Sequence, residues 1–205
     1  MRFFGGSDAK DAAAKAAARM TRVSSGWSHL LKSLRDAEGQ RILDIGPTSS
    51  TNINFLTNLG HSIYMANLAA EAADPRWIPS EPDQPFPVEA FMNENLDFTG
   101  RRFDTILLWD ALDYLDAATR KAVVDRFHEV LEPGGQLLAF FHIKPETGLY
   151  RYHLRDDGQV EAQQTSNLAV KDILNNRQVE NLFGDYSSYK FFLAKDNLRE
   201  VIVTR

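Results

Sequence analysis

The 205-residue sequence predicts a three-layer α/β fold built on a mostly parallel sheet, and three segments carry that prediction. Residues 41–67 contain an apolar strand, a small-residue turn, a helix closed by Gly60 and a second strand, which is the unit that builds parallel sheets. Residues 103–109 form a continuous apolar run, as expected for a strand covered on both faces. Residues 189–194 and 199–204 predict a closing antiparallel hairpin.

The composition is that of one ordinary domain, since 205 residues with 43% hydrophobic side chains can bury a single core. A net charge of −5 without a long Lys/Arg block argues against a broad nucleic-acid or membrane interface. No apolar run reaches the roughly 20 residues that cross a bilayer, and no signal segment is evident, so we expect a cytoplasmic protein. The absence of cysteine excludes thiolate nucleophiles and Cys-ligated zinc, and no metal site is predicted.

Residues 1–37 are expected to form a helical extension. An alanine-rich helix is predicted over 7–23 and a second helix over 28–37. After a short helical piece at 69–73, five of the eight prolines fall between residues 75 and 87, which predicts a rigid surface loop. The third strand is then expected at 88–92.

The second half of the chain continues the alternation of helix and strand. A helix is predicted over 117–131 with Asp116 as its N-cap, followed by the fifth strand at 136–141. Residues 149–164 alternate in hydrophobicity around a tight turn and predict an inserted hairpin, and residues 167–183 return to helix.

Two motifs resemble the class I S-adenosylmethionine-dependent methyltransferases: Leu43-Asp-Ile-Gly46 before a turn, and Leu131-Glu-Pro-Gly-Gly135 before a strand. The resemblance runs from about Leu30 to the end of the chain. It implies a Rossmann-like methyltransferase fold with a mostly parallel seven-stranded sheet, a single domain over 1–205, and S-adenosylmethionine as cofactor. The implied cofactor contacts are Asp44, Gly46, Thr48, Ser50, Asn67, Leu68, Asn93, Glu94 and Asp110.

Three of these cofactor contacts depart from the family pattern, at four positions. Thr48 and Ser50 replace the second and third glycines of the turn, and each adds a Cβ and a hydroxyl. Asn67 replaces the acidic residue that binds the ribose hydroxyls, and Asn93 replaces an aspartate near the adenine. Two interpretations follow. Either these hydroxyls and amides hold the cofactor in a methyltransferase, or the chain is a non-catalytic binding or scaffold domain that has lost cofactor binding.

The candidate catalytic groups, Asp110 and His142, follow the fourth and fifth strands and should reach the same sheet edge as the Gly46 turn. Asp110 or Asp113 could orient an acceptor or act as its base, with Tyr114 lining the pocket. Alternatively, Asp110 caps a turn, Asp113 is solvated and His142 is structural, since His142 has no obvious carboxylate partner in the sequence.

The inserted hairpin is expected to contact the substrate, because this family often builds its substrate-specific cap there. Its aromatic and cationic residues would suit a planar or anionic small-molecule acceptor, although an ordinary hairpin with one buried face explains the same alternation. The candidates are Tyr150, Arg151, Tyr152 and His153. The sequence identifies neither the acceptor nor an oligomeric state.

Overall fold

The computed structural model describes residues 18–81, 83–192 and 196–205. Its centre is a six-stranded sheet with the order β3-β2-β4-β5-β9-β8. The first four strands in this order are parallel, whereas β9 is antiparallel to both β5 and β8. The α/β class and the closing hairpin are therefore confirmed. The strands are β2 (Arg41–Ile45), β3 (Ser62–Ala66), β4 (Phe103–Trp109), β5 (Leu131–His142), β8 (Ser188–Phe192) and β9 (Leu198–Thr204).

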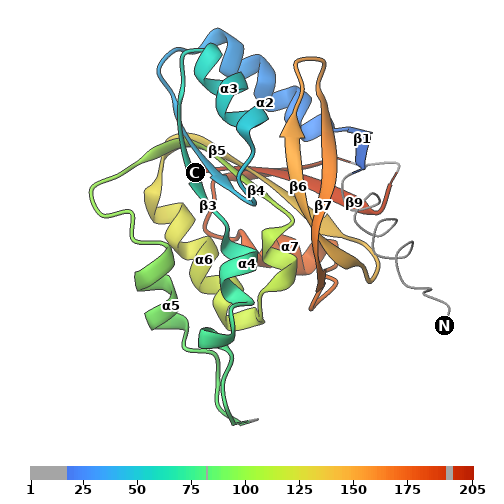
Figure 1. Cartoon of the computed structure of the whole chain (residues 1–205). Helices are drawn as coiled ribbons and strands as arrows, with labels where there is room; N and C mark the ends of the chain where they lie inside the picture. The colour runs from blue at the N-terminus through green and yellow to red at the C-terminus, as the bar shows by residue number, and fades with distance from the viewer. Residues whose placement is uncertain (1–17, 82, 193–195) are drawn as a thin grey trace, which may run out of the picture.

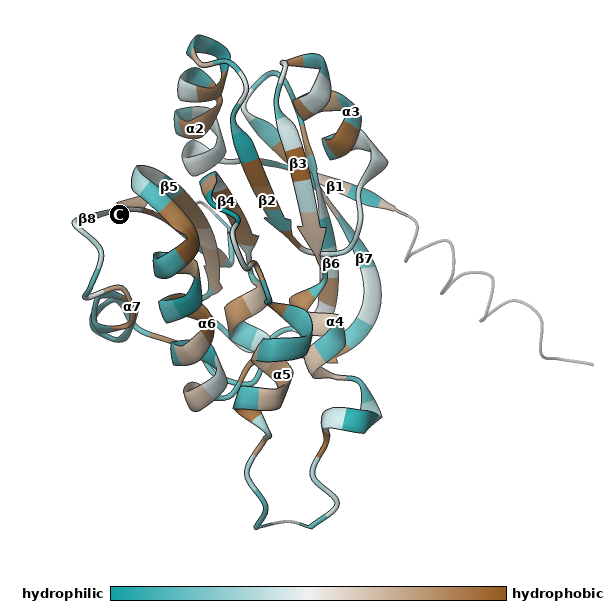
Figure 2. Ribbon diagram, turned by 90° about the vertical axis from the view of Figure 1, so that its left-hand side faces the viewer, coloured by the Kyte–Doolittle hydropathy of each residue, from teal (hydrophilic) through white to brown (hydrophobic). Residues whose placement is uncertain are grey.

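Helices cover both faces of this sheet, which gives three layers (Figure 1). On one face, α2 (Ser25–Asp36) and α3 (Ser50–Asn58) pack through Trp27 and Leu56. On the other face lie α4 (Leu68–Ala72), α5 (Val88–Asn95), α6 (Ala117–Val130) and α7 (Asn176–Leu182). The apolar run of β4 is buried on both sides, as a strand between two helical layers requires. Figure 2 shows its brown ribbon inside the molecule.

A second, three-stranded antiparallel sheet has the order β1-β7-β6. It consists of β1 (Arg19–Val23), β6 (Thr147–Leu154) and β7 (Gln159–Ala169), so the predicted inserted hairpin is confirmed. Gly158 turns the hairpin with a φ of 80°, a left-handed conformation that favours glycine. The turn is held on α2, because the indole nitrogen of Trp27 donates to the carbonyl of Arg155 over 2.8 Å.

Two predicted elements are wrong, and a third is shorter than expected. Residues 88–92 are not a strand but part of helix α5, whose apolar residues Val88, Phe91 and Met92 follow the helical spacing i, i+3, i+4. Consequently, among the residues that the structure describes, the main sheet has six strands and not seven. Residues 19–23 are strand β1 because β7 supplies a pairing partner, and the rest of that predicted helix, up to residue 17, lies outside the described residues.

The helix predicted over 167–183 is also shorter than expected. Residues 167–169 complete β7, and α7 starts only after Asn175, which forms a capping box with Gln178. The helix predicted over 117–131 is confirmed, with the Asp116 carboxylate accepting from the backbone of Ala118 and Thr119. No helix in the described ranges is long and apolar enough to cross a membrane.

Candidate functional site

The turn after β2 begins at buried Gly46 and ends in the first turn of α3. Ser49 caps that helix, because its hydroxyl accepts from the backbone N–H of Asn52 over 3.2 Å. Thr48 and Ser50, the residues predicted to contact the cofactor, are exposed, whereas Ser49 between them is buried. The hydroxyl that faces the interior of this turn is therefore one that the sequence interpretation did not select.

The indole of Trp109, the last residue of β4, covers Gly46. A Cβ built on Gly46 would lie 3.1 Å from Trp109 Cδ1, and the indole nitrogen donates to Asp44 Oδ1 over 2.6 Å. Trp109 has a φ of 51°, which is unusual for a bulky side chain and indicates local strain. Its ring stacks on Tyr152 of the hairpin, with centroids 5.0 Å apart. Burial raises the pKa of Asp44 to about 6.

Asn52 joins the turn to strand β6. Its Nδ2 group donates to Asp44 Oδ2 over 2.9 Å and to the carbonyl of Tyr152 over 3.0 Å, and its Oδ1 accepts from the backbone of Leu154 over 2.8 Å. Beside it, the hydroxyl of Ser49 is hydrogen-bonded to His153 Nδ1 over 2.8 Å. The hairpin is thus fixed directly over the N-terminus of α3.

The other predicted cofactor contacts are spread over two places. Asn67 and Leu68 lie where β3 meets α4, and Asn67 Oδ1 is buried with no hydrogen-bond partner among the described residues. Asn93 and Glu94 lie instead on the exposed side of α5, where Glu94 pairs with Arg76. Because residues 88–95 are helical, neither Asn93 nor Glu94 stands at the end of a strand as the prediction assumed.

Asp113 and His142 form a buried pair at the ends of β4 and β5. Asp113 Oδ2 accepts from both the backbone N–H of His142, over 2.6 Å, and its ring Nδ1, over 2.8 Å. This contact assigns the proton to Nδ1 and leaves Nε2 as the free nitrogen. Burial opposes the charged imidazolium, but the bond to Asp113 and the charges of Asp110 and Asp113 together raise the pKa of His142. Asp113 is therefore not solvated.

Asp110 lies behind this pair, with Oδ2 placed 4.0 Å from His142 Nε2. The same oxygen accepts from the hydroxyl of Tyr152 over 2.9 Å and from that of Tyr114 over 3.3 Å. Burial raises the pKa of Asp110 to about 6. Two carboxylates, a histidine and two phenols from three parts of the sequence thus meet at one sheet edge.

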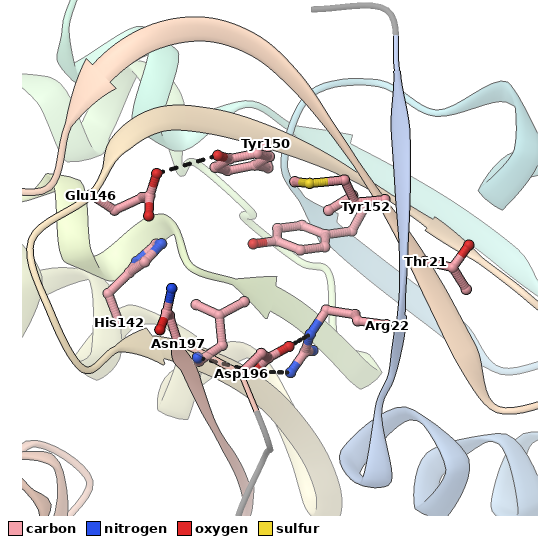
Figure 3. A pocket seen from close by; sticks show the side chains of 11 residues that line it. Thr21, Arg22, His142, Glu146, Tyr150, Tyr152, Asp196 and Asn197 are labelled. Atoms are coloured by element: carbon pink, nitrogen blue, oxygen red, sulfur yellow. Dashed lines mark hydrogen bonds and ion pairs between the residues drawn. The ribbon is translucent and has the colours of Figure 1, made fainter. Parts of the chain in front are cut away.

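A pocket of about 300 Å³ opens beside this cluster, between the two sheets. Figure 3 shows the imidazole of His142 directed toward Glu146 and the rings of Tyr150 and Tyr152 across the pocket. Arg151 and His153 alternate with these tyrosines and do not line it; Arg151 contacts Gln163 and His153 contacts Ser49. The full lining is Met20, Thr21, Arg22, His142, Glu146, Tyr150, Tyr152, Ala162, Asp196, Asn197 and Leu198.

Sequence reasoning missed three residues that shape this region: Trp109, Asn52 and Glu146. A bulky aromatic directly before Asp110 at a strand end was a visible signal for Trp109. Nothing local marks Asn52, because its partners lie on other elements. Glu146 lies in the connection before β6, and only the fold shows that this connection borders the pocket.

Only one part of S-adenosylmethionine, the cofactor implied by the resemblance, fits these residues. The unused acceptor of Asn67 suits a ribose hydroxyl. At Gly46, however, the Trp109 indole takes the space over the turn, and both oxygens of Asp44 are already hydrogen-bonded. The methionine half of S-adenosylmethionine therefore does not fit while Trp109 holds this position.

Comparison with known proteins agrees with the fold. No curated protein matches the chain in sequence. The PH0226 protein of Pyrococcus horikoshii OT3 has a similar structure (12% identity, 87% of this chain and 88% of that one, TM-score 0.53). So has a SAM-dependent methyltransferase of Methanosarcina mazei (16% identity, 82% and 93%, TM-score 0.50). Magnesium protoporphyrin IX methyltransferase of Synechocystis PCC 6803, with bound SAM, is a further match (14% identity, 97% and 92%, TM-score 0.49).

At such identities the first two likenesses show the fold alone. The sequence shows the family, because the sequence model of the methyltransferase-domain family matches residues 17–147, more than half of the chain. S-adenosylmethionine is the cofactor of this methyltransferase family. The chain belongs to the methyltransferase-domain family.

Proposed function

We propose that the chain transfers a methyl group to a small-molecule acceptor bound in the pocket beside His142. The observation that carries this proposal is the Asp113–His142 pair, whose free Nε2 borders a pocket at the carboxyl edge of the sheet. A histidine held by a carboxylate is suited to take a proton from an acceptor hydroxyl or amine. Membership of the methyltransferase family supplies the reaction class.

In this proposal each residue has a separate task. Asp113 orients the imidazole through its two contacts and stabilises the imidazolium once Nε2 has taken the acceptor proton. Asp110 supports the same charge from 4.0 Å. General-base catalysis of this kind contributes about 10²- to 10⁴-fold. The family cofactor, when bound, supplies the methyl group, and Asn67 is the residue with an acceptor to hold its ribose.

A second candidate function is a non-catalytic binding or scaffold domain. The specific observation in its favour is the Trp109 indole over Gly46, hydrogen-bonded to Asp44 and stacked on Tyr152. The two candidates differ in whether Trp109 moves. In the enzyme the ring leaves Gly46 when the cofactor binds, whereas in a scaffold domain it stays as part of the core.

Calorimetric titration with S-adenosylmethionine and S-adenosylhomocysteine separates them. The enzyme predicts micromolar binding to the wild-type chain and tighter binding to Asn67→Asp, which offers the ribose a charged acceptor. The scaffold domain predicts no binding to the wild type at millimolar ligand. Trp109→Gly removes the ring and suits the positive φ, so binding regained in this variant alone would identify Trp109 as the obstacle.

Trp77→Ala is the matched control for losing a buried indole. Trp77 packs on Phe91 in the other core cluster, so its loss should leave ligand affinity unchanged.

A further inference from the structure

Arg22 lines the pocket beside His142, and its positive charge is already neutralised by carboxylates. Arg22 is bound through two nitrogens to Asp196, at 2.6 and 3.2 Å, and pairs with Glu200 at 2.8 Å, off the line of an ideal hydrogen bond. Its guanidinium also lies over the ring of Phe140, 4.7 Å from the centroid. Because two carboxylates hold this side chain, it is a poor partner for an anionic ligand.

Glu146, by contrast, brings a carboxylate to the pocket without a cationic partner in the described part of the chain. Its one polar side-chain contact there is the hydroxyl of Tyr150, at 3.5 Å. Glu146 is half-buried, and Figure 3 shows its side chain beside the imidazole of His142 in the lining of the same pocket. With one arginine and two carboxylates in its lining, the pocket thus carries a net negative charge while His142 is neutral.

The walls of the pocket are suited to a flat molecule. Tyr150 and Tyr152 present rings 6.5 Å apart and tilted by 44°. Met20, Ala162 and Leu198 add apolar surface. A volume of about 300 Å³ is at the small end of ligand sites and accommodates a single-ring compound. Aromatic faces next to a carboxylate are a favourable environment for an ammonium group.

We propose that this pocket binds a small planar amine in its ammonium form, with Glu146 as counter-ion and His142 Nε2 as the acceptor of one ammonium proton. The N–H bond of the ligand breaks, the proton joins Nε2, and the electron pair stays on the ligand nitrogen. His142 becomes an imidazolium held by Asp113, and the ligand becomes a neutral amine with a nucleophilic lone pair. The use of that lone pair for methyl transfer rests on the proposed function, but the binding of the amine does not.

This ligand has the opposite charge to one of the acceptors that the hairpin sequence suggested. The anionic alternative depended on Arg151 and His153, and both residues lie on the strand face away from the pocket. A planar ligand agrees with both the sequence and the structure.

Three probes with the same phenol ring test the charge. Tyramine carries an ammonium, tyrosol a hydroxyl and 4-hydroxyphenylacetate a carboxylate. Calorimetry on the wild-type chain without cofactor should show tyramine binding at least tenfold tighter than the other two. In Glu146→Gln the affinity for tyramine should fall about tenfold and approach that of tyrosol. Glu89→Gln, which alters an exposed glutamate on α5, should change nothing.

A second readout follows the proton. The ring nitrogens of His142, followed by NMR, should shift when tyramine is added and not when 4-hydroxyphenylacetate is added at the same concentration. The proposal is overturned if no probe binds, if the carboxylate probe binds as tightly as tyramine, or if Glu146→Gln leaves tyramine affinity unchanged. Amine binding without any S-adenosylmethionine binding would support this inference and contradict the proposed function.

Discussion

Replacing Asn52 with alanine should weaken the attachment of the inserted hairpin to α3 and β2 and so destabilise the chain. The Asn52 side chain is 1% exposed and makes three hydrogen bonds, to Asp44, Tyr152 and Leu154. Alanine removes all three and leaves a carboxylate oxygen, a carbonyl and an N–H buried without these partners. Each costs about 1 to 3 kcal/mol, so the loss should be about 3 kcal/mol or more. That is a large part of the 5 to 15 kcal/mol that stabilises a typical domain.

Urea unfolding followed by tryptophan fluorescence measures this loss. Asn54→Ala is the matched control, because Asn54 is an exposed residue of the same helix and gains the same helix propensity. The quantity of interest is the difference in the free energy of unfolding between the two variants. A difference below about 1 kcal/mol would refute the conclusion that Asn52 fixes the hairpin.

Three further predictions concern the turn, the buried carboxylate and the histidine. Gly158→Ala should destabilise the chain by more than about 1 kcal/mol in urea unfolding, since φ is positive and the new Cβ would lie 2.2 Å from Ser28 Oγ. The pKa of Asp44 is about 6 in the folded chain, above its ordinary value of 3.8. The protonated carboxyl therefore stabilises the folded chain fully below pH 3.8, and this stabilisation is lost as the pH rises through 6. Wild type should therefore gain about 2 kcal/mol relative to Asp44→Asn between pH 7 and pH 4, and parallel pH profiles would contradict this. Asp113→Asn should lower the pKa of His142 in an NMR titration, and an unchanged pKa would show that the contact does not hold the imidazolium.

Local sequence determined most of the elements. The uninterrupted apolar run of β4, the Asp116 cap of α6 and the turn of the hairpin each depend on neighbouring residues, and all are found as predicted. Residues 88–92 were assigned to the wrong element because a short apolar run fits both a strand and a helix. In the folded chain this run packs as a helix against Trp77 and the α6 layer, so its partners decided the outcome.

The sequence by itself also placed four candidate residues at one sheet edge: Asp110, Asp113 and Tyr114 follow β4, and His142 ends β5. Only the tertiary structure decided their partners. Asp113 and His142 are 29 residues apart, and they meet because parallel β4 and β5 end together. The direction of the Trp109 side chain depends on its φ of 51°, a backbone angle that the residue type does not predict. The indole covers Gly46 because β2 and β4 are neighbours in the sheet. A motif at the end of a strand determines where the backbone turns. The space above that turn depends on side chains from strands that are far away in the sequence and adjacent in the sheet.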